Sequence, residues 1–241
     1  MTETRRTLPL DGIKVLDFSQ AMSGPACSML LADFGADVIK IEPPAGDSSR
    51  KWGSARYGKD NEFSSMYLAL NRNKSSISVN LKHPDGIAMI RRMAQQADVV
   101  LENFTPGVMA RLGIGYEALA KINPRIVYCA ISGFGQTGPL AARPGYDQLM
   151  QAYAGLLSVT GEANRTAVRI GPSAIDILTG SNAAFGILAA LRERDRSGRG
   201  QAVDTSLYES AIHMMTHMIV DYSGTSRLPE KTGPYFSFLA P

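Results

Sequence analysis

The chain has 241 residues, 44% hydrophobic and 20% charged, which is enough to bury the core of one large domain or of one and a half. Its 25 basic and 22 acidic residues are interspersed and give a formal net charge of +3, so no sustained basic face for nucleic acid is predicted. The polar start argues against a leader, and the lack of an apolar run of about 20 residues argues against a membrane span. The two cysteines are too far apart in the sequence to indicate a disulfide framework. Together these features predict a cytoplasmic protein.

The first half of the chain alternates predicted strands and helices. Residues 13–18 read as a strand, residues 25–34 as a helix opened by proline, and residues 37–42 as a second strand. The pattern then repeats. It predicts a strand near 76–81, a helix at 84–96, a strand at 99–103, a helix around 116–122 and a strand at 126–131.

Uninterrupted apolar runs such as residues 126–131 suit strands that are covered on both faces by helices. We therefore predict an α/β fold with an open, mostly parallel, Rossmann-like sheet and helices on both faces. Ligands in such folds gather at the carboxyl ends of the strands. Segments 19–25, 103–107 and 132–139 lie there and carry glycine, proline and small polar residues, so they are the candidate floor of a binding site.

The second half is predicted to be mainly helical. One helix follows Tyr146, and another runs from the region of Asp176 to Arg194, ending at Gly198. Ser206 and Glu209 have the spacing of a capping box, which predicts a last helix at about 207–222.

Asp176 is the most informative residue, because it is a carboxylate in a stretch of small and apolar residues. Burying an ionised carboxylate is costly unless it is paired or hydrogen-bonded. The residue either caps the helix that follows, as an N-cap, or performs chemistry. The sequence around it favours neither alternative over the other.

Three further groups have competing interpretations. Glu209, His213 and His217 share one helix face, but the capping box and the neighbouring methionines favour a packed helix over a metal site. The first loop has only Gly24, so a dinucleotide fingerprint is not supported, although its backbone could still bind a phosphate. The set formed by Asn103, Phe104 and Arg111 suits an adenine and a phosphate, or simply a turn with a surface arginine.

Several ordered segments resemble the family III CoA-transferases, the group that contains formyl-CoA transferase, carnitine CoA-transferase and α-methylacyl-CoA racemase. The resemblance covers nearly the whole chain. It rests on segments 10–18 (LDGIKVLDF), 23–25 (SGP), 31–42 (LADFGADVIKIE), 70–75 (LNRNKS), 102–107 (ENFTPG), 143–147 (RPGYD) and 197–201 (SGRGQ).

The resemblance implies roles for particular residues. Asp176 is the catalytic aspartate by position. The coenzyme A site is implied to comprise Ala21, Met22, Asn80, Leu81, Lys82, Asn103, Phe104, Arg111, Arg143 and Tyr146. Pro43 stands where some family members have an arginine, which places one adenine or phosphate contact in question.

The implied activity is transfer of CoA from an acyl-CoA donor to a carboxylic acid acceptor, through covalent intermediates on Asp176. CoA or acyl-CoA is then the substrate, and no metal, nucleic acid or membrane is expected. The alternatives are an acyl-CoA racemase or epimerase, and a catalytically incomplete CoA-binding fragment. Tyr146 stands where the racemase branch has a histidine, which favours transfer.

The resemblance also implies a domain organisation. We expect residues 1–205 to form a Rossmann-like CoA-binding large domain, and residues 206–241 to form a linker helix and the start of a truncated second domain. Family members are longer, and they suggest an interlocked homodimer.

Overall fold

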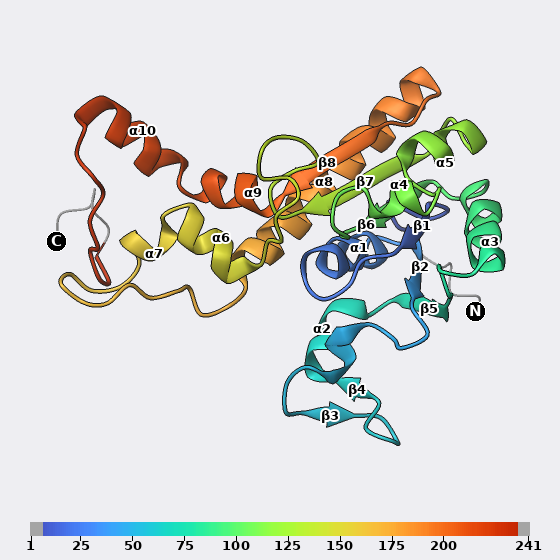
Figure 1. Ribbon diagram of the computed structural model, residues 1–241, viewed down its shortest axis with the longest axis horizontal. Helices are drawn as coiled ribbons and strands as arrows, with labels where there is room; N and C mark the ends of the chain where they lie inside the picture. Colours follow the sequence, from blue (N-terminus) through green and yellow to red (C-terminus); the bar gives the residue numbers. More distant parts are fainter. Residues whose placement is uncertain (1–6, 236–241) are drawn as a thin grey trace.

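A computed structural model describes residues 7–235, and a parallel sheet lies at its centre (Figure 1). The strand order is β5-β2-β1-β6-β7-β8, and every pairing in it is parallel. The strands are β1 (Lys14–Asp17), β2 (Asp37–Glu42), β5 (Lys74–Ser78), β6 (Val99–Glu102), β7 (Val127–Ser132) and β8 (Ala202–Ser206). The predicted α/β class and the open parallel sheet are confirmed.

The two faces of the sheet are buried under different helices. In β7, Val127, Cys129 and Ile131 join one core cluster, whereas Tyr128 and Ala130 join the other, as the two-residue period of a strand requires. The first cluster includes α1 (Ser23–Asp33) and α8 (Ala174–Ser197). The second includes α3 (Pro84–Ala94), α4 (Val108–Arg111) and α5 (Tyr116–Ile122).

The strand order changes direction between β1 and β6. From β1 the chain moves outward through β2 to β5, and then returns to the other side of β1 for β6, β7 and β8. Loops that follow the two strands at such a switch point diverge, which leaves a crevice at the carboxyl ends of the strands. The fold therefore directs attention to the loops after β1 and β6.

Several elements lie outside the predicted pattern. The segment between β2 and β5 contains a 3₁₀ turn η1 (Ser48–Lys51), a hairpin of β3 (Arg56–Tyr57) and β4 (Phe63–Ser64), and helix α2 (Ser65–Asn71). Strand β8 was not predicted, and β5 begins at Lys74 rather than near residue 76. The helix predicted after Tyr146 is split into α6 (Asp147–Tyr153) and α7 (Leu156–Val159) by Gly155, which has a φ of 87°.

Helix α8 ends where the sequence predicts, because Gly198 takes the left-handed conformation with a φ of 75°. Among residues 7–235 it alone is long and apolar enough to cross a membrane by length and composition. Its buried residues, including Ala183 and Ile187, belong to the core cluster with α1 and the sheet. We interpret α8 as a core helix.

The capping box at Ser206 is confirmed, since its hydroxyl oxygen accepts a hydrogen bond from the Glu209 backbone N–H and its O–H contacts the Glu209 carboxylate. The single helix predicted at 207–222 is wrong in one respect. The chain forms α9 (Leu207–Met214) and α10 (Thr216–Thr225), which meet at Met215. Together with α6 and α7 these helices extend away from the sheet (Figure 1). The domain division at 205/206 stays a prediction, and its outer ends lie outside the described residues.

Candidate active site

A cavity of about 420 Å³ opens at the switch point. Its wall combines the loop after β1, the residue that follows β6, the end of β7, and the beginnings of α6 and α8. The lining residues are Gln20, Ala21, Met22, Ser23, Trp52, Asn103, Ile131, Ser132, Gly133, Gly145, Tyr146, Asp147, Gln148, Arg169, Ser173, Asp176 and Leu207. The cavity therefore lies where ligands bind in open α/β sheets.

Asp176 is the third residue of α8, and the capping role considered for it belongs to another residue. The cap position is Ser173, whose side chain makes no capping hydrogen bond. The carboxylate of Asp147 instead accepts hydrogen bonds from the backbone N–H groups of Ile175 at 2.8 Å and Asp176 at 3.3 Å. Interpreting Asp176 as the N-cap is therefore wrong, and its half-buried carboxylate has no hydrogen bond to any described residue.

Two causes raise the pKa of Asp176 to about 7. The larger is burial, which disfavours the charged form, and the smaller is the nearby negative charge of Asp147. No cation among residues 7–235 lowers this pKa in compensation. The carboxylate is consequently poised between its neutral and ionised forms near neutral pH, as a nucleophile or a base requires.

For the CoA transfer on Asp176 that the sequence resemblance implies, the raised pKa predicts how turnover depends on pH. Only the ionised carboxylate is nucleophilic, so kcat/KM should rise about tenfold per pH unit below pH 7 and level off above it. Rates measured from pH 5 to 9 with a thioester that is stable over this range check this prediction. A profile that is flat through pH 7 would contradict it.

Close packing of α8 on α1 places Asp176 over the first loop. Gly180 follows Asp176 by one helical turn, so the two residues share a face of α8. A Cβ atom at Gly180 would lie 2.6 Å from the Ser23 carbonyl oxygen and 2.9 Å from the Ala26 Cβ. Only glycine permits this approach, which brings the Asp176 carboxylate beside the beginning of α1.

The first loop itself has an unusual backbone. Ala21 has a φ of 67°, a left-handed conformation that costs a non-glycine residue about 1–3 kcal/mol. Asn103 holds the loop, because its side chain accepts from the Gln20 N–H at 2.9 Å and donates to the Gln20 carbonyl at 2.8 Å. The side-chain amide thus joins the two loops at the switch point and fixes one wall of the cavity.

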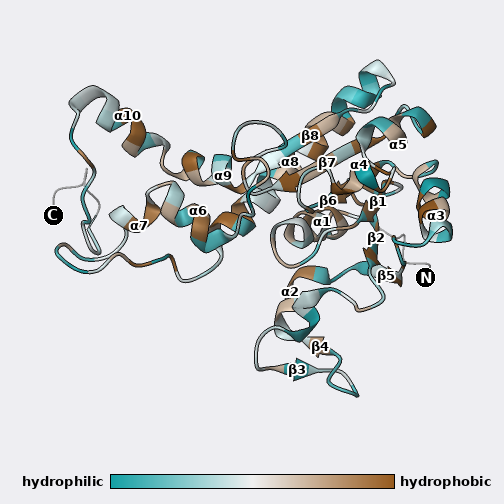
Figure 2. Ribbon diagram, viewed as in Figure 1, coloured by the Kyte–Doolittle hydropathy of each residue, from teal (hydrophilic) through white to brown (hydrophobic). Residues whose placement is uncertain are grey.

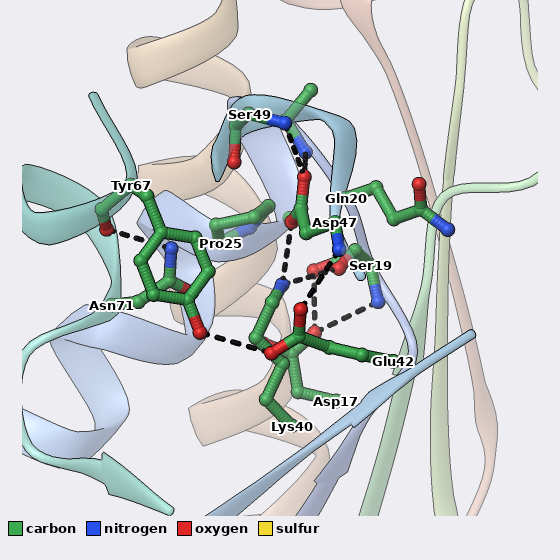
Figure 3. Close-up of polar contacts among 12 residues, drawn as sticks. Asp17, Ser19, Gln20, Pro25, Lys40, Glu42, Asp47, Ser49, Tyr67 and Asn71 are labelled. Atoms are coloured by element: carbon green, nitrogen blue, oxygen red, sulfur yellow. Dashed lines mark hydrogen bonds and ion pairs between the residues drawn. The ribbon is translucent and has the colours of Figure 1, made fainter. Parts of the chain in front are cut away.

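A buried charge network lies beneath that loop (Figure 3). The Lys40 ammonium donates to the Ser19 carbonyl at 2.7 Å and pairs with Asp47 at 2.9 Å. Asp47 in turn accepts from the Ala21 N–H at 3.3 Å and the Ser49 N–H at 2.8 Å. One ion pair therefore connects β2, the first loop and the segment that leads to Trp52.

Carboxylates at the ends of β1 and β2 extend this network. Asp17 accepts from Ser28 at 2.5 Å and pairs with Lys74 at 3.3 Å. Glu42 accepts two hydrogen bonds from Arg50, at 2.7 and 2.8 Å, and one from Tyr67 at 2.9 Å. Burial, the largest influence, would raise the pKa of Glu42, but hydrogen bonds from Arg50, from Ser76, from the Asp47 backbone N–H and from Tyr67 lower it to about 2. The segment between β2 and β5 is thereby tied to the sheet.

A second cavity, of about 480 Å³, lies next to the first and shares Gln20 with it. It lies at the carboxyl ends of β2, β5 and β6, and most of its wall is apolar. The lining residues are Gln20, Ile41, Pro43, Pro44, Ala45, Val79, Asn80, Leu81, Lys82, Phe104, Val108 and Leu112. A ligand long enough to enter both cavities would pass Gln20.

The structure places most of the expected site residues along these two cavities. Ala21, Met22, Asn103, Tyr146 and Asp176 line the first. The second is lined by Asn80, Leu81, Lys82 and Phe104.

Two expected residues line neither cavity. Arg111 is exposed at the end of α4. Arg143 is also exposed and donates to the Tyr153 hydroxyl at 3.1 Å.

Several polar or aromatic side chains of the first cavity were not predicted, and three of them matter most for its chemistry, namely Asp147, Trp52 and Arg169. Asp147 was noted only as part of a resembling segment, yet it organises the start of α8. Trp52 and Arg169 come from irregular segments without a hydrophobic period. Trp52 is the single tryptophan of the chain, and this feature could have marked it as a candidate site residue.

The metal interpretation of Glu209, His213 and His217 gains no geometric support. His213 belongs to α9 and His217 to α10, with Met215 between the two helices. Among residues 7–235 no three His, Cys, Asp or Glu side chains are grouped so that they could hold a metal ion.

Comparisons with known proteins agree with one another. The sequence pattern of CoA-transferase family III matches residues 10–238. The chain is 42% identical over 242 residues to the succinyl-CoA–D-citramalate CoA-transferase of Chloroflexus aurantiacus, which covers 100% of this chain and 60% of that protein. It is also 42% identical over 215 residues to the succinyl-CoA:glutarate CoA-transferase of Homo sapiens, with 89% and 48% covered.

Solved structures show the same relationship. A CAIB/BAIF family protein from Brucella suis superposes with a TM-score of 0.94 at 38% identity, over 98% of this chain and 63% of that one. The chain spans about half to three fifths of the length of the curated relatives it matches here.

Proposed function

Because the chain belongs to CoA-transferase family III, we propose that it transfers CoA from an acyl-CoA to the carboxylate of a second acid through covalent intermediates on Asp176. The observation that carries this proposal is the state of the Asp176 carboxylate. It lines a cavity at the switch point, it has no capping role, and its pKa is raised to about 7.

The first half of the reaction releases the donor acid. A carboxylate oxygen of Asp176 attacks the thioester carbonyl carbon, the carbon–sulfur bond breaks, and CoA leaves as a thiolate while the acyl group and Asp176 form a mixed anhydride. The thiolate then attacks the Asp176 carbonyl carbon and expels the donor acid, which leaves CoA on Asp176 as a thioester.

The second half repeats these steps in reverse with the acceptor. The acceptor carboxylate attacks the Asp176 thioester, which releases the CoA thiolate and forms a mixed anhydride of Asp176 and the acceptor. The thiolate then attacks the acceptor carbonyl carbon of this anhydride, which gives the new acyl-CoA and restores the Asp176 carboxylate. Both intermediates remain activated, so no ATP is needed. The positive end of α1 faces the cavity through Ser23 and has no capping side chain, so it would stabilise the negative charge that develops.

The two adjacent cavities suit the two ends of an acyl-CoA. We assign the adenine to the apolar second cavity, where Phe104 can stack and Lys82 can approach a phosphate. The pantetheine arm would pass Gln20 and bring the thioester to Asp176. This assignment gives Ala21, Met22, Asn80, Leu81, Asn103 and Tyr146 the contacts expected of them. Arg111 and Arg143 line neither cavity. In this assignment they would contact a CoA phosphate that lies outside both cavities.

Shortening Phe104 to alanine is expected to raise the Kd for CoA about tenfold, because an aromatic face that stacks on a base contributes about 1–3 kcal/mol. Isothermal titration with free CoA measures the effect. Phe34→Ala is the matched control, since Phe34 is half-exposed at the end of α1 and lines neither cavity. Equal affinities for the two variants would overturn the adenine assignment.

Assembly and location are part of the proposal. We propose a homodimer in the cytoplasm. Large apolar side chains are exposed on α8, on α10 and after it, namely Phe185, Val220 and Leu228. Apolar segments also run along α9 and α10 in Figure 2, and a second copy would bury such a surface.

The direct test of transfer uses succinyl-CoA as donor and glutarate as acceptor, two compounds that appear in the name of the human relative. Formation of glutaryl-CoA with a matching loss of succinyl-CoA, without ATP, supports transfer. If the α-hydrogen of a branched acyl-CoA exchanges with deuterated water and no acceptor gains CoA, the reaction is racemisation instead.

A further inference from the structure

Within the described part of the chain, residues 7–235, Arg169 is the only lysine or arginine that lines the first cavity. It lies in the irregular segment between α7 and α8, and the same cavity is lined by the carboxylates of Asp147 and Asp176. The cavity is thus lined by the carboxylate proposed as the nucleophile and by one positive charge, on the exposed side chain of Arg169. The proposed reaction uses the Asp176 carboxylate. None of its steps involves Arg169.

The guanidinium of Arg169 has no acidic partner among the described residues. Its Nη1 donates to the carbonyl oxygens of Ile170, at 3.0 Å, and Gly171. In contrast, Arg50, Arg72 and Arg194 each pair with a carboxylate. The burial-raised pKa of Asp176 shows no lowering by Arg169, so the arginine does not neutralise the nucleophile. Its charge and its remaining N–H donors stay available to a ligand.

Asp147 holds the Arg169 segment and the Asp176 segment in a fixed relationship. One carboxylate oxygen of Asp147 accepts from the Gln151 side chain at 2.5 Å, and the Gln151 carbonyl oxygen accepts from the Ile170 N–H at 2.8 Å. The other oxygen accepts from the Ile175 N–H at 2.8 Å. Asp147 is buried and Gln151 is fully buried. The backbone beside Arg169 is therefore held to the start of α8 by buried side chains, and the exposed Arg169 side chain extends from this held segment to the cavity.

The number of carboxylates on a substrate acid determines whether the Arg169 guanidinium can bind it. A carboxylic acid that enters this cavity brings one carboxylate to the reacting centre. A dicarboxylic acid also brings a second carboxylate. This group loses solvation when it enters the cavity, and the loss costs binding free energy unless a cation compensates for it. A guanidinium binds a carboxylate through two parallel hydrogen bonds. A monocarboxylic acyl chain offers it nothing.

We propose that Arg169 binds the remote carboxylate of dicarboxylic substrates, so that the site selects dicarboxylic acids and their mono-CoA thioesters over monocarboxylic ones of equal length. The inference rests on the proposed function, since it takes Asp176 as the point where the acyl carbon reacts. Arg169 is then a specificity-determining residue that takes no part in bond making.

Binding to the Asp176→Ala variant tests this proposal without any turnover. Succinyl-CoA and butyryl-CoA share a four-carbon acyl chain and differ by the remote carboxylate. We expect Asp176→Ala to bind succinyl-CoA about tenfold more tightly than butyryl-CoA, because only succinyl-CoA can form charge-assisted hydrogen bonds with Arg169. Adding Arg169→Gln should abolish this preference and leave the Kd of butyryl-CoA unchanged, whereas Arg169→Lys should retain part of it.

Arg165→Gln is the matched control. Arg165 lies four residues earlier, is exposed, pairs with Glu162 at 4.0 Å and does not line the cavity. It should keep the full preference for succinyl-CoA. Equal binding of the two thioesters, or a preference that survives Arg169→Gln, overturns this inference and leaves the proposed function standing. If Asp176→Ala binds neither thioester nor free CoA, the proposed function fails and this inference fails with it.

Discussion

Replacing Asp176 with asparagine is expected to lower CoA transfer by on the order of 10⁴-fold or more, since removal of a covalent nucleophile has effects of this size. The amide has nearly the shape of the carboxylate but cannot form the anhydride. CoA should still bind, because the second cavity is untouched. The measurement is kcat with saturating donor and acceptor, together with the Kd for CoA.

The folded state of Asp176→Asn should be at least as stable as the unaltered chain, and this separates loss of chemistry from loss of structure. The pKa of Asp176 is about 7 in the folded protein and about 4 in an unfolded chain. Its ionisation therefore favours unfolding as the pH rises from about 4 to 7. Asparagine removes this penalty, so the Tm of the variant should exceed that of the parent at pH 8 but not at pH 4.

Asp195→Asn serves as the matched control on the same helix, since Asp195 is exposed and distant from the cavity. It should leave turnover unchanged and show no comparable gain in Tm between pH 4 and 8. Transfer by Asp176→Asn at the rate of the unaltered chain would eliminate the covalent mechanism.

Replacing Lys40 with methionine is expected to reduce the free energy of unfolding by about 3–5 kcal/mol, the usual cost of removing one partner from a buried ion pair. Lys40 and Asp47 have side chains exposed by 1% and 0%, so the remaining carboxylate would stay in the interior without its counter-charge. The Ser19 carbonyl would also lose its donor. Urea denaturation followed by circular dichroism measures the loss.

Arg72→Met provides the comparison for Lys40. Arg72 pairs with Asp33 at the surface, where an ion pair contributes at most about 1 kcal/mol. A loss in Lys40→Met no larger than in Arg72→Met would show that the network does not stabilise the first loop. In the expected case, CoA affinity should fall in Lys40→Met and not in Arg72→Met, because only Lys40 supports the cavity wall.

Local signals in the sequence were sufficient for five of the six strands of the central sheet. Uninterrupted apolar residues identify β6 and β7, the proline at the start of α3 and the glycine after α8 mark helix ends, and Ser206 with Glu209 marks the start of α9. Strand β8 was missed because this edge strand has only two apolar residues, Ala202 and Val203, followed by three polar ones, so it lacks a continuous apolar run. The hairpin of β3 and β4 was missed because each strand has only two residues.

The candidate site was predictable only where it lies next to regular elements. Asn103 follows a buried strand and Asp176 begins a long helix, so both were identified from the chain. Lys40 and Asp47 were not, because a charge inside a strand shows its partner only after folding. Arg169 has the same difficulty, since nothing in its irregular segment indicates which cavity it will face.

The central claim is that Asp176 carries the covalent intermediates, and trapping tests it most directly. The chain is incubated with succinyl-CoA, quenched in acid, digested and analysed by mass spectrometry, with Asp176→Asn as the blank. We predict a succinyl or CoA adduct on the peptide that contains Asp176 in the unaltered chain, and none in the variant. Transfer of CoA that proceeds with no adduct on Asp176, or with an adduct on another residue, would contradict the claim.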